Sequence, residues 1–129
     1  MNNLSTNRIL VVDDEPDIAL SLKIGLENNG GFIVDMFDDP IEALSNFKAG
    51  KYDLLLLDIK MPKMDGFELY KEIKKKDDKV KICFLTASES YYDEFKGTFP
   101  KLNIRCFACK PVSIQELIKV VKEELLDKQ

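Results

Sequence analysis

The stretch YDLLLLDIKMPKMDG, residues 52–66, decides the fold of this chain. Its four consecutive leucines do not alternate with polar residues, so both faces of the segment are expected to be buried. Such a short apolar run is typical of a central strand in a parallel sheet covered by helices. Asp58 follows directly, at the strand end where open α/β sheets bind ligands. An isolated aspartate can equally well begin a turn, so other residues must decide its role.

The composition describes a globular chain that fits one domain. It has 129 residues, of which 45% are hydrophobic and 33% are charged, and none of its apolar runs is long enough to cross a membrane. A net charge of −4 without a basic stripe argues against direct binding of nucleic acid. Residues 1–7 are polar and lack the apolar core of a signal peptide. We expect a disordered lead-in there, no membrane partner and a cytoplasmic location.

Three cysteines and no histidine limit the available chemistry. Zinc binding and nucleophiles activated by histidine are disfavoured. Cys106 and Cys109 have the C-x-x-C spacing, but a predicted strand would hold them about 10 Å apart on opposite faces, beyond the reach of a disulfide. We therefore expect all three cysteines, Cys83 included, to be buried and reduced.

Five predicted strands alternate with five predicted helices. The strands are expected at residues 8–12, 32–36, 54–57, 80–85 and 104–108. Helical patterns begin at Pro16, Pro40 and Phe67, around Tyr91 and Phe95, and after Ser113. Asp14 or Glu15 is the expected cap of the first helix, and Ser113 with Glu116 forms a capping box for the last. This alternation predicts a parallel sheet with right-handed crossovers and helices on both faces.

Polar side chains follow four of the predicted strands. Asp13 and Asp14 follow the first strand, Asp58 the third, Thr86 the fourth and Lys110 the fifth. The carboxyl ends of parallel strands meet at one edge, so these side chains converge if the four strands are neighbours. Each residue alone has an ordinary explanation as a helix cap, a turn residue or a solvated charge. Their joint occurrence at one edge favours a common site.

The charges of this cluster suggest its chemistry. Clustered carboxylates repel one another unless a cation intervenes, and hard oxygen ligands favour Mg²⁺. Asp13 and Asp14 would hold the metal, while Asp58 would attack phosphorus and form an aspartyl phosphate. Lys110 and the Thr86 hydroxyl would contact the phosphoryl oxygens, because phosphoryl transfer needs mainly positioning and charge stabilisation.

Four motifs together resemble the receiver domain of bacterial and archaeal response regulators. They are VVDDEP at 11–16, LLDIKMPKMDG at 56–66, TA at 86–87 and KP at 110–111. The resemblance covers residues 8–127, with 1–7 as a lead-in and 128–129 as a tail. It implies a flavodoxin-like, doubly wound α/β fold with five helices and a five-stranded parallel sheet in the order 2-1-3-4-5.

The resemblance implies that a sensor histidine kinase or a phosphotransfer protein phosphorylates Asp58. It further implies that Mg²⁺ is bound by Asp14, Asp58 and the backbone carbonyl of Lys60, with Asp13 assisting through water. The chain would then be a regulatory phosphoacceptor, which assists only its own phosphorylation and dephosphorylation. Its partner would be a downstream protein target or an output domain, and a phosphorylation-dependent dimer is compatible with the family.

Further residues match family positions that carry the response. Thr86 and Phe107 are expected to shift together on phosphorylation, although Phe107 lacks the hydroxyl of the tyrosine found there in many relatives. Lys60 and Ser88 match positions that affect hydrolysis of the phosphoryl group. We expect Lys60 to lie over the site and to change the access of the attacking water.

The chain departs from the family before its fifth strand. Residues 100–104 replace the usual Gly-Ala pair, and the segment from Thr86 to Lys110 is slightly long. Tyr91, Tyr92 and Phe99 in this segment either pack in the core or form an aromatic contact patch. The sequence leaves the output surface open, and also whether the chain acts alone or belongs to a longer protein.

Two other functions share part of this residue pattern. Phosphatases with an aspartate nucleophile typically carry a second aspartate two residues after the first, where this chain has Lys60. A phosphate-independent interaction module of the same fold is the other alternative. The intact acidic cluster, Thr86 and Lys110 argue against it.

Overall fold

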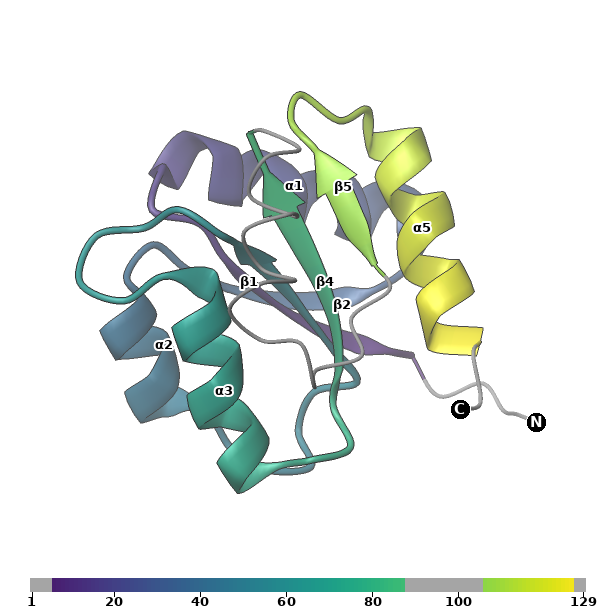
Figure 1. Cartoon of the computed structure of the whole chain (residues 1–129). Coiled ribbons are helices and arrows are strands. Elements are labelled where there is room, and N and C mark those ends of the chain that lie inside the picture. The colour runs from purple at the N-terminus through teal and green to yellow at the C-terminus, as the bar shows by residue number, and fades with distance from the viewer. Residues whose placement is uncertain (1–5, 88–105, 127–129) are drawn as a thin grey trace.

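The computed structural model describes residues 6–87 and 106–126 (Figure 1). The helix expected around Tyr91 and Phe95 lies outside the described residues, as do Ser88, Tyr92, Phe99 and the departure at 100–104. The elements of the described part are β1 (Arg8–Val12), α1 (Pro16–Gly30), β2 (Ile33–Phe37), α2 (Pro40–Asn46), β3 (Leu54–Asp58), α3 (Gly66–Lys76), β4 (Lys81–Thr86), β5 (Phe107–Cys109) and α5 (Ile114–Leu126). None of these helices is long and apolar enough to cross a membrane.

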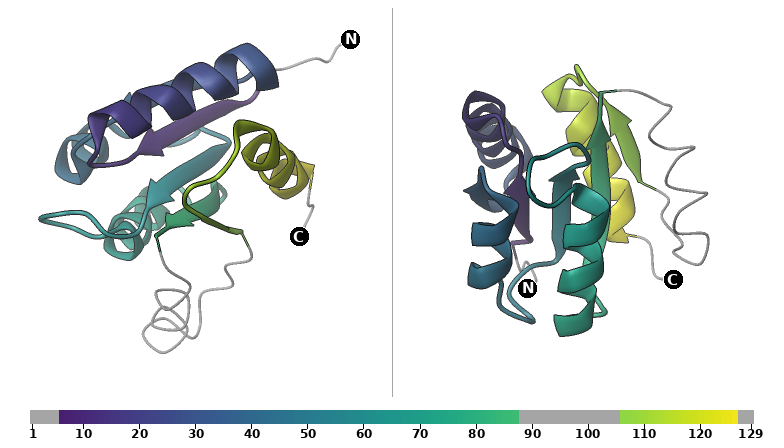
Figure 2. Two further views of the ribbon diagram at one scale, coloured as in Figure 1. Left: turned by 90° about the horizontal axis from the view of Figure 1, so that it is seen from above. Right: turned by 60° about the vertical axis from the view of Figure 1, so that its left-hand side comes forward.

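The strands form one parallel sheet in the order β2-β1-β3-β4-β5, as predicted. Helices cover both of its faces, with α2 and α3 side by side on one and α1 and α5 on the other (Figures 1 and 2). The sheet is therefore doubly wound, and β3 occupies the central position expected for the leucine run.

The leucine run of β3 supplies both hydrophobic cores. Leu55 and Leu57 pack on the α2 and α3 side, whereas Leu54 and Leu56 pack on the α1 and α5 side. All four are fully buried, which explains why the run does not alternate with polar residues. Rings of α3 surround Phe84 of β4 on the first side.

Side chains cap the starts of α3 and α5, and of these two caps the sequence predicted only that of Ser113 at α5. At α3, Asp65 Oδ1 accepts a hydrogen bond from the Glu68 amide at 2.8 Å, and Glu68 Oε1 accepts one from the Asp65 amide at 3.0 Å. At α5, Ser113 Oγ accepts from the Glu116 amide at 3.1 Å. At α1, Glu15 is the capping residue as expected, but its side chain forms no cap hydrogen bond.

Four strands differ from the prediction, and β3 extends one residue beyond its expected end, to Asp58. β2 and β4 each begin and end one residue later than expected, because Phe32 and Val80 belong to the core but precede the ladder. The described part of β5 begins at Phe107, and it extends one residue beyond the expected end, to Cys109. Cys109 therefore lies on the strand directly before Lys110.

The prediction of three buried, reduced cysteines is confirmed for the burial of Cys83 and Cys106 and for the reduced state of Cys109, and is otherwise wrong. Cys83 and Cys106 form a disulfide, with Cα atoms 4.6 Å apart, and Cys109 is free and exposed. β4 and β5 are neighbours in which Phe84 pairs with Phe107, so the preceding residues of the two strands face each other. As the strand geometry had indicated, Cys106 and Cys109 do not form a disulfide with each other.

Candidate functional site

The carboxyl ends of β1 and β3 bring three carboxylates together. Val12 pairs with Leu57, so Asp13 and Asp58 are the next residues on neighbouring strands. Oxygen atoms of Asp13, Asp14 and Asp58 all lie within 4.8 Å of one another. Asp13 and Asp58 are buried, while Asp14 is half-buried.

The carboxyl ends of β4 and β5 add the cation and the hydroxyl. Thr86 ends β4 and is buried, and its carbonyl accepts a hydrogen bond from the Lys110 amide at 2.8 Å. Lys110 Nζ lies 2.8 Å from Asp13 Oδ2 and 3.4 Å from Asp58 Oδ2. The three aspartates and Lys110 therefore lie together at this edge, and Thr86 ends the strand between those that lead to Asp58 and Lys110.

Glu15 also lies beside the site, although its role was predicted only as a helix cap. Its Oε1 lies 3.8 Å from Lys110 Nζ, and its amide donates a hydrogen bond to Asp13 Oδ1 at 3.0 Å. The run Asp13-Asp14-Glu15 was the sequence signal that could have placed Glu15 beside the site. The amide of Glu15 orients the Asp13 carboxylate, which is the closest partner of Lys110.

Charge crowding shifts the protonation of the central aspartate. Burial raises the pKa of Asp58 to about 7, with the negative charge of Asp13 and a hydrogen bond with Asp14 adding to it, while Lys110 opposes the rise. Burial lowers the pKa of Lys110, but Asp13 and Asp58 outweigh burial and raise it on balance. The cluster thus has more negative charge than one lysine compensates.

The donor set fits a hard divalent cation. All three clustered groups offer carboxylate oxygens, which suit Mg²⁺. Among the described residues, the buried Oδ2 of Asp13 has no partner with hydrogen-bond geometry, despite its ion pair with Lys110. A bound cation or its water ligand would satisfy that oxygen and would favour the ionised form of Asp58.

The loop between β3 and α3 borders the site with a groove of about 500 Å³. Lys60 is exposed and lines this groove together with Asp14. The loop is tied to the start of α2, since Lys63 Nζ lies 2.9 Å from Asp39 Oδ2. Lys63 has a φ of 73°, a conformation unusual for a residue with a Cβ, and the sequence argument did not anticipate it.

Gly66 closes the loop against the strand end that carries Asp58. A Cβ at this position would overlap the carbonyl oxygen of Asp58, and the Gly66 amide donates to the carbonyl of Ile59 at 2.8 Å. The Asp-Gly pair that ends the deciding stretch is therefore needed for the close approach of α3 to β3.

Comparison with known proteins agrees with this geometry. Residues 9–122 match the family described as the response regulator receiver domain. The chain belongs to this family. It is 35% identical over 119 residues to the transcriptional regulatory protein PrrA of Mycobacterium leprae. The aligned region covers 92% of this chain and 50% of that protein. The chain spans about half the length of the first curated relatives it matches.

Solved receiver structures superpose on most of the chain. The response regulator TrrA from Thermotoga maritima in complex with Mg²⁺-BeF is 39% identical, with a TM-score of 0.79 and coverage of 94% of this chain and 100% of that one. The receiver domain of HemR from Leptospira biflexa is 27% identical, with a TM-score of 0.82 and coverage of 96% and 98%. The predicted flavodoxin-like receiver fold is therefore confirmed, and receiver domains are regulatory phosphoacceptor modules of two-component signalling that bind Mg²⁺ at an acidic pocket.

The predicted switch residues of the receiver domain lie on adjacent strands. Phe107 is half-buried, and its ring centroid lies 5.6 Å from that of Phe84. Thr86 is two residues beyond Phe84 on the same strand and faces Cys109 in the register. Their joint movement stays a prediction, and Ser88 lies outside the described residues.

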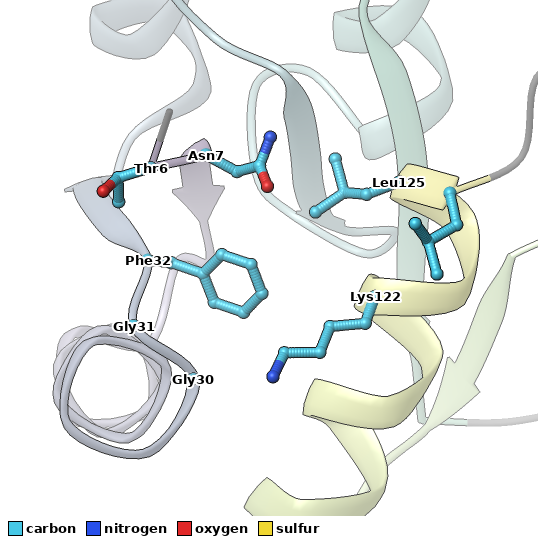
Figure 3. A pocket seen from close by; sticks show the side chains of 8 residues that line it. Thr6, Asn7, Gly30, Gly31, Phe32, Lys122 and Leu125 are labelled. Carbon is cyan, nitrogen blue, oxygen red and sulfur yellow. The ribbon is translucent and has the colours of Figure 1, made fainter. Parts of the chain in front are cut away.

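A second hollow, of about 290 Å³, lies at the opposite end of the sheet. Its walls are Phe32 and the backbone at Gly30 on one side, and Lys122 and Leu125 of α5 on the other (Figure 3). Its described lining contains no carboxylate.

Proposed function

We propose that the domain, spanning residues 8–127, accepts a phosphoryl group on Asp58 and thereby changes its contacts with other proteins. The observation that carries this proposal is the grouping of Asp58 with two further aspartates and Lys110 at one edge of the sheet. The phosphodonor is a phosphohistidine of a sensor kinase or of a phosphotransfer protein. The protein that reads the change is a downstream target or an output domain.

In the proposed reaction, an oxygen of the Asp58 carboxylate attacks the phosphorus atom. The new O–P bond forms as the P–N bond to the donor histidine breaks, and the imidazole takes the bonding electrons. The carboxylate must be ionised to attack, whereas burial and Asp13 hold its pKa near 7. A neighbouring positive charge therefore favours the reactive form.

Lys110 supplies positive charge from this chain. Its Nζ lies 3.4 Å from Asp58 Oδ2, within reach of phosphoryl oxygens carried by that carboxylate. The Thr86 hydroxyl would donate a hydrogen bond to one of them. Mg²⁺, held by Asp14, Asp58 and the Lys60 carbonyl with Asp13 acting through water, would supply further positive charge to the phosphoryl oxygens.

Intact mass spectrometry tests this proposal. The protein is incubated with Mg²⁺ and acetyl phosphate, beside Asp58→Asn and the control Asp38→Asn, an exposed aspartate after β2. We expect one phosphoryl group on wild type and on the control, and none on Asp58→Asn. Absence of the modification in wild type with Mg²⁺ bound would favour a phosphate-independent module. Equal modification of Asp58→Asn would assign the acceptor to another residue.

We further propose that Lys60 limits the lifetime of the phosphoryl group from its place on the groove. The decay of phosphorylated wild type and Lys60→Ala is compared, with Lys71→Ala, an exposed lysine of α3, as the control. A changed lifetime in Lys60→Ala alone is the expected result. Identical lifetimes would remove Lys60 from the reaction.

A further inference from the structure

The disulfide between Cys83 and Cys106 joins the two strands that carry three of the proposed functional side chains. Cys83 lies on β4, three residues before Thr86, and Cys106 directly precedes Phe107. The Phe84 amide also donates a hydrogen bond to the Cys106 carbonyl at 3.0 Å. The covalent link thus lies at the start of the β4–β5 ladder, and Lys110 lies just beyond its other end.

β5 is the shortest strand in the described part of the chain. It is three residues long and pairs with β4 alone, at the edge of the sheet (Figure 1). The hydrogen bond from the Lys110 amide to the Thr86 carbonyl closes the far end of this short ladder. Lys110 follows this ladder directly and reaches Asp13 and Asp58, so the pairing of β5 with β4 places its ammonium in the site.

We propose that the Cys83–Cys106 disulfide is a redox-controlled positioning element, which fixes Lys110 in the site when oxidised and relaxes it when reduced. The proposal rests on the phosphoacceptor function of Asp58. Cys83 and Cys106 touch no reacting atom, so they act through the placement of β5. Formation or loss of the disulfide would then change how fast the domain is phosphorylated.

The chemistry is thiol–disulfide exchange with a dithiol reductant. One thiolate of the reductant attacks a disulfide sulfur, forms a mixed disulfide and releases the other cysteine as a thiolate, which takes up a proton. The second thiol of the reductant then displaces the remaining cysteine and closes its own disulfide. Two electrons and two protons pass to Cys83 and Cys106, and a low-molecular-weight disulfide reverses the reaction.

Burial makes this exchange depend on the edge strand. Cys83 and Cys106 are buried in the core that includes Leu117 and Val121 of α5, so a reductant gains access only when β5 separates from β4. Cys109, in contrast, is free and exposed. It provides an internal reference, because it is alkylated in the folded protein whichever state the pair has.

The experiment compares oxidised and reduced wild type, prepared with oxidised glutathione or dithiothreitol. Alkylation after denaturation counts free thiols, and intact mass spectra follow phosphorylation by acetyl phosphate. In the oxidised form we expect no free thiol at Cys83 or Cys106, with Cys109 either free or carrying one glutathione that intact mass detects, and in the reduced form we expect three free thiols. The reduced form should be phosphorylated about fivefold more slowly, less than the ~10²-fold or greater loss when a charge-stabilising group is removed.

Two further measurements separate positioning from general loosening of the fold. Mg²⁺ affinity, measured by calorimetry, should be no weaker after reduction, because the proposed ligands lie on β1, β3 and the loop after β3. The double variant Cys83→Ala/Cys106→Ala should have the slow rate with or without dithiothreitol. Cys109→Ala should keep the response of wild type.

Three results would overturn the proposal. These are three free thiols in the protein treated with oxidised glutathione, equal phosphorylation rates in both states, and weaker Mg²⁺ binding on reduction. If neither state takes up a phosphoryl group, the phosphoacceptor function itself fails. If both states take it up equally, only the redox inference fails.

Discussion

The two edge strands of the sheet, β2 and β5, are stabilised by different contacts. At the β2 edge, side chains of α1 satisfy the outward backbone groups of Val34: its amide donates to Glu27 Oε2 at 3.2 Å, and its carbonyl accepts from Lys23 Nζ at 2.7 Å. Lys23 and Glu27 also pair with each other at 3.0 Å. Unpaired edge groups invite association with other strands, so this arrangement protects β2.

The β5 edge relies on a disulfide and a short ladder. Its three described residues lie between Cys106, bonded to Cys83, and Lys110, whose ammonium reaches the acidic cluster. The edge that α1 stabilises carries none of the proposed phosphoryl-transfer or switch residues, whereas the β5 edge carries Phe107 and is followed by Lys110. We therefore expect movement on phosphorylation at the β5 edge rather than at the β2 edge.

Removing the β5-edge cation should have the largest effect. Lys110→Ala is expected to slow phosphorylation by acetyl phosphate about 10²-fold or more, because a charge-stabilising group at the phosphoryl oxygens is lost. Initial rates from intact mass spectra measure this. The matched control is Lys51→Ala, whose ammonium lies 3.4 Å from Asp35 Oδ2 towards the β2 edge, and it should keep the wild-type rate. Equal losses in both variants would contradict the difference between the edges.

Removing the covalent link should destabilise the domain. Cys83 and Cys106 are 23 residues apart, so their disulfide restricts the unfolded chain and is expected to contribute about 3 kcal/mol to the free energy of unfolding. Urea denaturation of Cys83→Ala/Cys106→Ala under non-reducing conditions measures the loss. Cys109→Ala should change stability by less than about 0.5 kcal/mol. A double variant as stable as wild type would contradict this account of the β5 edge.

Between the edges, the metal-free site should oppose folding as the pH rises. The folded-state pKa of Asp58 is raised to about 7 from its ordinary value of 3.8, so the folded protein binds the proton more tightly than the unfolded chain does. The stabilisation from this proton is complete below pH 3.8 and is lost as the pH rises through 7. In thermal melts with a metal chelator present, the melting temperature of Asp58→Asn should therefore rise relative to that of wild type as the pH increases from 5 to 8. A difference in melting temperature that stays constant over that pH range would contradict the raised pKa of Asp58.

The β2 edge should show a smaller pH effect of the opposite sign. The hydrogen bond from Lys23 lowers the pKa of Glu27 below 4.5, with the Val34 amide adding to it. Its stabilising effect is present above pH 4.5 and is lost as the pH falls through the lowered value. The melting temperature of Glu27→Gln should therefore lie below that of wild type at pH 7 and approach it at low pH. The control Glu72→Gln removes an exposed pair with Lys75 on α3 and should shift the melt less.

The sequence predicted the central features because each has a local signal. The leucine run indicated a strand buried on both faces, and the residues after the strands indicated Asp13, Asp58, Thr86 and Lys110 as one site. Strand register then brought them together, since parallel neighbours end at the same edge.

The features that were missed depend on contacts between distant segments. Neither the Cys83–Cys106 pairing nor the Lys63–Asp39 ion pair follows from local spacing. The disulfide could have been found by combining the strand order implied by the family with the two cysteine positions, because strands four and five are neighbours in that order. The Cys106–Cys109 spacing, in contrast, is a local signal and indicates nothing about Cys83.

Direct localisation of the phosphoryl group tests the central claim most closely. Borohydride reduces an aspartyl phosphate to homoserine, which marks the modified residue for peptide mapping by mass spectrometry. After incubation with Mg²⁺ and acetyl phosphate, the account predicts homoserine at position 58 and aspartate at positions 13 and 14. Homoserine at position 13 or 14, or an unmodified Asp58 in protein that has gained a phosphoryl group, would contradict it.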